Sequence, residues 1–168
     1  MKKEYKIAVI GLGYVGLPLA LAFSKNNLVV GYDINSERVS ELNCETDCNN
    51  DFNFQTNSNL IFSSNEESIK HCNIFIITVP TPVNKDNSPD LSLLNLASLT
   101  VASFLKKDDI VIYESTVYPG VTEEVCVPIL ESSSGLRFNF DFYCGYSPER
   151  ISPGSGNYTL QNVVKVTS

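Results

Sequence analysis

The sequence predicts an α/β domain in which helices cover both faces of a doubly wound, mainly parallel sheet. Three observations predict this fold class. Short runs rich in Val and Ile recur along the chain, segments of helical length separate them, and a glycine-rich turn directly follows the first run. Parallel strands need long crossovers, usually helices, so this β-α-β rhythm favours a parallel sheet over a meander.

Seven apolar runs are predicted to be strands, at residues 6–10, 28–32, 60–62, 73–79, 110–114, 142–145 and 163–166. The first, fourth and fifth runs are almost continuously apolar. Strands covered on both faces lose the alternation of apolar and polar residues, so these three are expected at the centre of the sheet.

Two helices and two loops are predicted between the strands. Residues 16–26 are apolar around most of the helical circumference and should form a buried helix. Residues 92–106 carry apolar residues at helical spacing, with Asp90 or Ser92 placed to cap the start and two lysines near the end. Residues 43–59 and 83–89 are rich in turn formers and are predicted to be loops.

Length and composition indicate one globular domain spanning residues 1–168, of which 43% are hydrophobic and 18% charged. No apolar stretch reaches the roughly 18 residues needed to span a bilayer, so we expect no membrane partner. The net charge of −7 argues against binding to nucleic acid. The first residues lack the pattern of a secretory signal, which favours the cytoplasm.

The chain contains five cysteines and one histidine, His71. The cysteines are odd in number and irregularly spaced, and no second pair exists that could complete a zinc site. We therefore expect reduced thiols and no metal site. The five positions are Cys44, Cys48, Cys72, Cys126 and Cys144.

A G-x-G-x-x-G turn follows the first strand and opens the first predicted helix. Gly11 would permit the tight turn, Gly13 would let a pyrophosphate approach the backbone, and Gly16 would let the helix pack closely on the strand. Such a turn can also serve packing alone. Its position between a buried strand and a helix is the context that favours dinucleotide binding.

The residues around this turn favour NAD as the ligand. Leu12, Tyr14 and Val15 are expected to offer backbone N–H groups to the phosphates. Asp33 ends the second strand, where a carboxylate accepts hydrogen bonds from the adenosine ribose and repels a 2′-phosphate. Arg38 could pair with a 2′-phosphate, but beside Asp33 it is expected to flank the adenine or ribose. FAD and S-adenosylmethionine are the alternative ligands.

Three later segments each follow a predicted strand: Val-Pro-Thr-Pro at 79–82, Glu-Ser-Thr-Val-Tyr-Pro-Gly at 114–120 and Tyr-Ser-Pro-Glu-Arg at 146–150. Each could be a simple turn, because Pro, Ser and Thr are good turn formers. The carboxyl ends of parallel strands share one edge of a sheet, however, and ligands bind there. Together the segments indicate one polar crevice.

With the glycine-rich turn and Asp33, these segments resemble the UDP-glucose/GDP-mannose dehydrogenase family over essentially the whole chain, and most closely its UDP-N-acetylhexosamine branch. The resemblance implies a Rossmann-type NAD-binding domain. It implies a nucleotide-sugar 6-dehydrogenase that oxidises the C6 alcohol of a UDP-sugar to a carboxylate with two NAD⁺, for surface polysaccharides such as capsule or O-antigen. A cysteine thiolate would hold the aldehyde as a thiohemiacetal and then as a thioester.

The resemblance also implies roles for residues near the crevice. Thr81 and Thr116 would contact the cofactor, and Thr116 would help to hold a catalytic water. Glu149 would activate water against the thioester, and Arg150 would contact the substrate. Some relatives carry a second acid where this chain has Pro153, so any role of that acid does not transfer.

The family's nucleophilic cysteine lies in a Gly-Gly-x-Cys segment that this sequence does not contain, and Cys144 is expected to be a buried apolar residue instead. We therefore expect a piece of a longer chain that binds NAD without turning over substrate. We expect the parent to be a homodimer and the piece to be a monomer. The alternatives are a stand-alone NAD-binding or redox-sensing module, or a 3-hydroxyacid or 6-phosphogluconate type of dehydrogenase.

Overall fold

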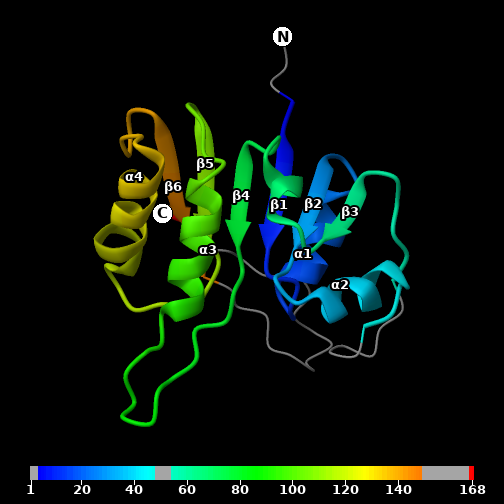
Figure 1. The fold of residues 1–168 in the computed structure, drawn as a ribbon, viewed down its shortest axis with the longest axis horizontal. Helices are drawn as coiled ribbons and strands as arrows, with labels where there is room; N and C mark the ends of the chain where they lie inside the picture. The colour runs from blue at the N-terminus through cyan, green and yellow to red at the C-terminus, as the bar shows by residue number, and fades with distance from the viewer. Residues whose placement is uncertain (1–3, 48–53, 149–166) are drawn as a thin grey trace.

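The computed structural model describes residues 4–47, 54–148 and 167–168. In this part of the chain, six strands form one parallel sheet in the order β3-β2-β1-β4-β5-β6 (Figure 1). The strands are β1 (Lys6–Ile10), β2 (Leu28–Tyr32), β3 (Leu60–Ser63), β4 (Ile74–Ile77), β5 (Asp109–Tyr113) and β6 (Phe142–Tyr146). The doubly wound α/β fold is thereby confirmed.

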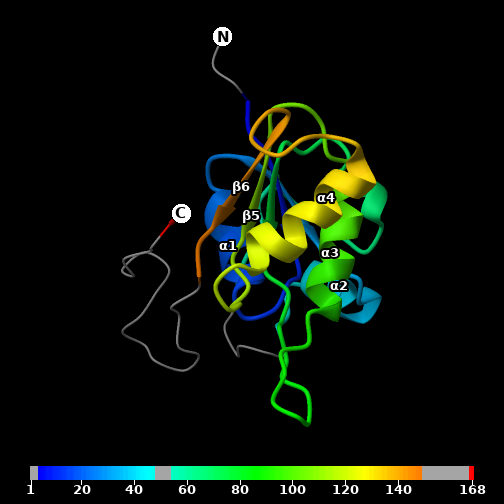
Figure 2. The same ribbon diagram turned by 90° about the vertical axis from the view of Figure 1, so that its left-hand side faces the viewer.

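Helices pack on both faces of this sheet (Figure 2). The helices are α1 (Gly16–Phe23), α2 (Ser36–Asn43), α3 (Ser92–Ala102) and α4 (Val127–Ser134), with a 3₁₀ turn η1 (Glu66–Ile69) and a π-helical turn η2 (Thr122–Cys126) that leads into α4. Helices α1 and α2 share one core, mainly with β1–β3, while α3, η2 and α4 share the other, mainly with β4–β6.

The central strand β1 contributes to both cores. Ile7 and Val9 point towards α1, whereas Ala8 and Ile10 point towards α3. All four side chains are at most 4% exposed. This double burial explains why the first run is apolar without alternation.

The predicted strands agree closely with the structure, and β1 and β2 have the predicted bounds. Strand β4 ends at Ile77 rather than at residue 79, since the chain leaves the sheet towards Pro80. Strand β5 begins and ends one residue earlier than predicted. The seventh predicted strand, at 163–166, lies outside the described residues.

Both predicted helices end earlier than the apolar pattern suggested. Helix α1 stops at Phe23, where turns formed by Asn26 and Asn27 replace the helix. Helix α3 stops at Ala102, so the two lysines near its predicted end lie beyond it. The N-cap position is Leu91, which forms no side-chain cap, so the prediction that Asp90 or Ser92 caps the helix was wrong; Asp90, one residue earlier, accepts a hydrogen bond from the Ser92 amide at 2.9 Å.

No helix was predicted for the residues of α2 or for the segment from η2 through α4. Helix α2 has two buried apolar side chains, Val39 and Leu42, too few to give a clear helical period. It is fixed instead by Asn35, whose side chain accepts from the amides of Glu37 and Arg38. The predicted loops hold within the described residues, although an antiparallel bridge between Val83 and Pro89 shapes the second.

Candidate functional site

The strand order reverses between β1 and β4, which is where open α/β sheets bind ligands. The hydrogen-bond ladder runs one residue past the strand ends at this edge. Gly11, Thr78 and Glu114 each donate a backbone N–H to the last residue of the neighbouring strand, at 2.8, 2.9 and 2.9 Å. Asp33 continues the same row on the other side through a 3.2 Å bond to Ser63. Residues from three predicted motifs thus lie along one edge.

The glycine-rich turn adopts a geometry that side chains would disturb. Gly11 has a φ of +92°, a conformation that favours glycine. A Cβ on Gly16 would lie 1.8 Å from the Gly11 carbonyl oxygen. Thr78 fastens the turn from β4, because its buried hydroxyl donates towards the Gly11 carbonyl at 2.7 Å and lies 3.0 Å from that of Ile10. Thr78 was not predicted to belong to the site. The one feature of the sequence that could have indicated it is a hydroxyl side chain directly after a central strand.

Gly13 has the opposite surroundings. A Cβ there would meet no heavy atom within 4 Å, so the space above its backbone is open. Within the described residues, the amide N–H groups of Gly13, Tyr14 and Val15 donate to no protein group. Unpaired amides at the start of a helix are suited to an anion such as a phosphate.

The Leu12 amide is used differently from the expectation. Its N–H donates to Asp33 Oδ2 at 2.8 Å and is thus already paired with a carboxylate. Asp33 Oδ1 accepts the Asn35 amide at 2.9 Å. A carboxylate has about four acceptor positions, so Asp33 can bind this turn and still accept hydrogen bonds from a ribose.

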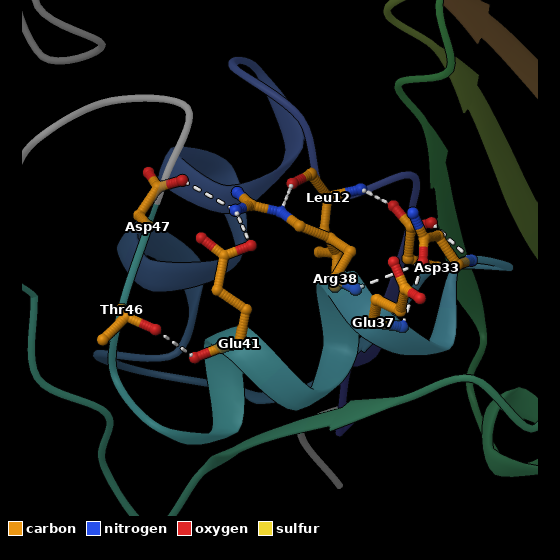
Figure 3. Close-up of polar contacts among 8 residues, drawn as sticks. Leu12, Asp33, Glu37, Arg38, Glu41, Thr46 and Asp47 are labelled. Atoms are coloured by element: carbon orange, nitrogen blue, oxygen red, sulfur yellow. Dashed lines mark hydrogen bonds and ion pairs between the residues drawn. The ribbon is translucent and has the colours of Figure 1, made fainter.

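Arg38 lies buried against the Leu12 peptide, with its side chain 8% exposed (Figure 3). Its Nε donates to the Leu12 carbonyl at 3.0 Å, and its Nη1 lies 3.1 Å from Glu41 Oε2 and 2.8 Å from Asp47 Oδ1. Burial lowers the pKa of Arg38, but the hydrogen bonds and charges of Asp47 and Glu41 raise it by more. Arg38 was predicted to flank the adenine or ribose, and these three internal partners were not predicted.

Three adjoining hollows, of about 460, 320 and 400 Å³, share Gly13 in their linings. The largest contains Asp33 and the turn, the smallest contains Asp33 and Arg38, and the third contains the turn with Thr81 and Thr116. Asp33, Arg38, Thr81 and Thr116, predicted from separate motifs, therefore line adjoining hollows around Gly13.

The largest hollow also has an apolar wall that the sequence analysis did not assign to a site. Ile34 from the end of β2 faces Leu93, Leu96 and Thr100 from α3 across it. Ile34 is 67% exposed, and Leu93 and Leu96 are 38% and 45% exposed. Apolar residues cover more of the circumference of α3 than a single buried face requires. These extra apolar residues were the feature of the sequence that could have indicated the apolar wall.

The third hollow contains the predicted hydroxyl groups. The Thr81 hydroxyl donates to the Thr116 backbone carbonyl at 2.6 Å, which ties the loop after β4 to the loop after β5. The Ser115 hydroxyl joins the same two loops through the Val79 carbonyl at 2.6 Å. The Thr116 side chain remains exposed to the cleft. Glu149 and Arg150 lie outside the described residues.

Cys144 lies within β6 and packs against the core that contains α3. Burial raises the pKa of its thiol to about 12. A thiolate is the reactive form of cysteine, so Cys144 is unsuited to act as a nucleophile near neutral pH. Among the described residues, Cys44, Cys72, Cys126 and Cys144 are all free thiols.

None of the helices within 4–47, 54–148 and 167–168 combines the length and apolar character that crossing a membrane requires. A model of the UDP-glucose/GDP-mannose dehydrogenase family, NAD binding domain, matches residues 5–167.

Two curated proteins named UDP-N-acetyl-D-glucosamine 6-dehydrogenase are similar to the chain. The one from Pseudomonas aeruginosa is 53% identical over 99% of this chain, and the one from Salmonella typhi is 55% identical over 98%. The chain spans 40% of the length of each. The solved structure of the UDP-D-ManNAc dehydrogenase from Pyrococcus horikoshii superimposes with a TM-score of 0.77 at 39% identity, covering 89% of this chain and 37% of that one.

Proposed function

The chain belongs to the UDP-glucose/GDP-mannose dehydrogenase family as its NAD-binding domain, and on that premise we propose that it serves a nucleotide-sugar 6-dehydrogenase. That enzyme oxidises the C6 alcohol of a UDP-N-acetylhexosamine to the uronic acid with two NAD⁺. The relatives at 53% and 55% identity are named for UDP-N-acetyl-D-glucosamine, which supports this sugar over UDP-glucose. Membership of this family favours this function over the alternative of a 3-hydroxyacid or 6-phosphogluconate type of dehydrogenase.

The observation that carries the proposal is the open space over Gly13 at the junction of the three hollows. A pyrophosphate placed there meets the amides of Tyr14 and Val15, which donate to no group among the described residues. The adenosine ribose then falls beside Asp33, and the adenine falls in the apolar hollow between Ile34 and Leu96. Bound NAD⁺ supplies the hydride acceptor for an alcohol oxidation.

The third hollow is proposed to hold the reacting end of the cofactor. Thr81 and Thr116 line it, and the Thr116 hydroxyl is exposed to orient a water molecule near the reacting carbon. We assign Glu149 the activation of that water and Arg150 a contact with the nucleotide sugar, on the resemblance of the Ser-Pro-Glu-Arg segment alone. The nucleophilic thiolate is assigned to the part of the parent enzyme that this sequence does not contain.

The proposal also includes a homodimeric parent enzyme that works in the cytoplasm. The four described cysteines are free thiols, the form that a reducing compartment maintains.

Calorimetric titration of the chain with NAD⁺, NADP⁺ and FAD tests the cofactor assignment. We expect binding of NAD⁺, much weaker binding of NADP⁺ because Asp33 repels a 2′-phosphate, and no binding of FAD. A flat NAD⁺ titration of folded protein would contradict the site.

The activity is tested on the longer protein that contains this domain. With UDP-N-acetyl-D-glucosamine as substrate, absorbance at the NADH wavelength should report two NADH for each sugar consumed. One NADH per sugar would indicate a single oxidation to the aldehyde or ketone and would reject the 6-dehydrogenase assignment.

A further inference from the structure

The smallest hollow is bordered by one cation and several carboxylates. Its lining consists of Leu12, Gly13, Asp33, Asn35, Glu37, Arg38 and Glu41. Among these described lining residues, Arg38 alone is a cation, while Asp33, Glu37 and Glu41 are acids. The hollow lies beside the carboxylate to which the adenosine ribose is assigned, so any substituent on the ribose 2′-oxygen enters this region.

A 2′-phosphate distinguishes NADP from NAD, and an arginine near the end of the second strand is the usual group that accommodates it. Arg38 has that position in the sequence. Its guanidinium nevertheless faces away from Asp33: Figure 3 shows the two side chains reaching the Leu12 peptide from opposite sides. Asp33 accepts from the Leu12 N–H, and Arg38 donates to the Leu12 carbonyl.

Two acidic residues hold the guanidinium in this orientation. Glu41 lies one helical turn after Arg38, with Oε2 at 3.1 Å from Nη1, and Asp47 approaches from beyond the end of α2, with Oδ1 at 2.8 Å. The side chain of Arg38 is 8% exposed and that of Asp47 is fully buried. Separating a buried ion pair leaves both charges poorly solvated, so Arg38 cannot leave these partners to pair with a phosphate in the hollow without a large loss of stability.

We propose that Glu41 and Asp47 are specificity-determining residues for the dinucleotide: by binding the Arg38 guanidinium against the Leu12 carbonyl, they withhold from the hollow the cation that would otherwise accept a 2′-phosphate. This inference rests on the proposed NAD site and adds a second determinant to Asp33. Asp33 repels the 2′-phosphate directly, whereas Glu41 and Asp47 prevent Arg38 from attracting it.

The test measures dissociation constants for NAD⁺ and NADP⁺ by calorimetry in Glu41→Gln, Asp47→Asn and the double variant. These changes keep the shape of each side chain and remove its charge. In the double variant we expect the ratio of the NADP⁺ to the NAD⁺ dissociation constant to fall by about fivefold, which corresponds to ~1 kcal/mol. Glu41→Gln alone should shift the ratio in the same direction by less.

Glu37→Gln is the matched control. Glu37 lines the same hollow and carries the same charge, but its side chain forms no ion pair with Arg38. The ratio should therefore change less in Glu37→Gln than in Glu41→Gln. An equal change would show that any lost negative charge favours NADP⁺, and the proposed role of the arginine would be overturned.

A second control repeats the double variant in an Arg38→Gln background, where the fall in the ratio should disappear. Persistence of the fall without Arg38 would overturn the inference, as would an unchanged ratio in folded Glu41→Gln and double variants. Thermal unfolding establishes which variants are folded, and Glu41→Gln, which keeps the Asp47 ion pair, provides the decisive comparison if Asp47→Asn unfolds. A wild-type chain that binds no NAD⁺ would instead reject the proposed function itself.

Discussion

At the scale of single residues, the phosphate-binding turn depends on groups outside the glycine motif. Both backbone polar groups of Leu12 are paired, its N–H with Asp33 and its carbonyl with Arg38. The Thr78 hydroxyl pairs with the Gly11 carbonyl from the neighbouring strand. The amides left unpaired in the turn are those of Gly13, Tyr14 and Val15 among the described residues. The turn is thus held in shape before a ligand arrives.

Gly13→Val should abolish NAD⁺ binding while leaving the fold intact. The new side chain would enter open space rather than the protein interior, because no heavy atom lies within 4 Å of a Cβ at this position. We expect the free energy of unfolding to change by less than about 1 kcal/mol and calorimetry to detect no binding. Retained affinity in this variant would exclude the turn as the pyrophosphate site.

Gly16→Ala is the matched comparison within the same motif. Its Cβ would lie 1.8 Å from the Gly11 carbonyl oxygen and 2.6 Å from the Thr78 hydroxyl, so the helix must move away from the strand. We expect a loss of about 3 kcal/mol in urea denaturation. A stable Gly16→Ala protein would show that the helix start can shift more freely than the packing indicates.

At the scale of elements, the short helix α2 positions side chains of the candidate site in addition to burying apolar residues. It buries Val39 and Leu42 against the sheet and carries Arg38 and Glu41 on the side that faces the turn. Eight residues with two apolar side chains form a marginal helix alone. Its end cap and its contacts with the sheet therefore determine whether Arg38 is held in place.

Asn35→Ala should loosen α2 and weaken the cofactor site together. The Asn35 side chain accepts from the amides of Glu37 and Arg38 at 2.9 and 3.3 Å, and losing such a cap costs about 1 kcal/mol. Urea denaturation should show this loss, and NAD⁺ affinity should fall by a few fold. Ser40→Ala is the control, because in the described part of the chain its exposed hydroxyl bonds only to the Ser36 carbonyl, and its loss should change neither quantity measurably.

At the scale of the whole molecule, a sheet buried on both faces places titratable side chains in the interior. Burial raises the pKa of Cys72 to about 11 and that of Cys144 to about 12, from a usual value of 9.0. Burial also raises the pKa of Tyr113, whose hydroxyl pairs with that of Ser98 at 2.9 Å. The folded protein holds these protons more tightly than the unfolded chain does.

The stability of the protein should therefore fall as the pH rises above about 9. For a group whose pKa is raised by folding, the contribution is complete below the unfolded pKa and is lost as the pH approaches the folded pKa. Between pH 7.5 and 9.5 we expect the unfolding free energy to fall by roughly 1–2 kcal/mol from Cys72 and Cys144 together. Urea denaturation at each pH measures the slope.

The double variant Cys72→Ala/Cys144→Ala should reduce that slope. If the double variant kept the full slope, the alkaline loss would come from the repulsion among surface charges of this acidic chain rather than from the buried thiols.

The sequence by itself determined the features that depend on neighbouring residues. Five strands of the sheet, β1–β3, β5 and β6, were placed to within about a residue at each end, because each is a short run rich in apolar residues between turn-forming segments. The turn at Gly11 and the acid at Asp33 were identified because each directly follows one of the first two strands. The carboxyl ends of parallel strands lie at the same edge of the sheet, so these residues come close together.

Tertiary structure alone decided what depends on residues distant along the chain. The partners of the Leu12 peptide, the pairing of Arg38 with Asp47 and the use of Leu93 and Leu96 to line a hollow rather than a core all require elements to be placed in space. A short helix such as α2 was missed for the same reason. Its stability comes from a cap and from contacts with the sheet, which a pattern of apolar residues does not record.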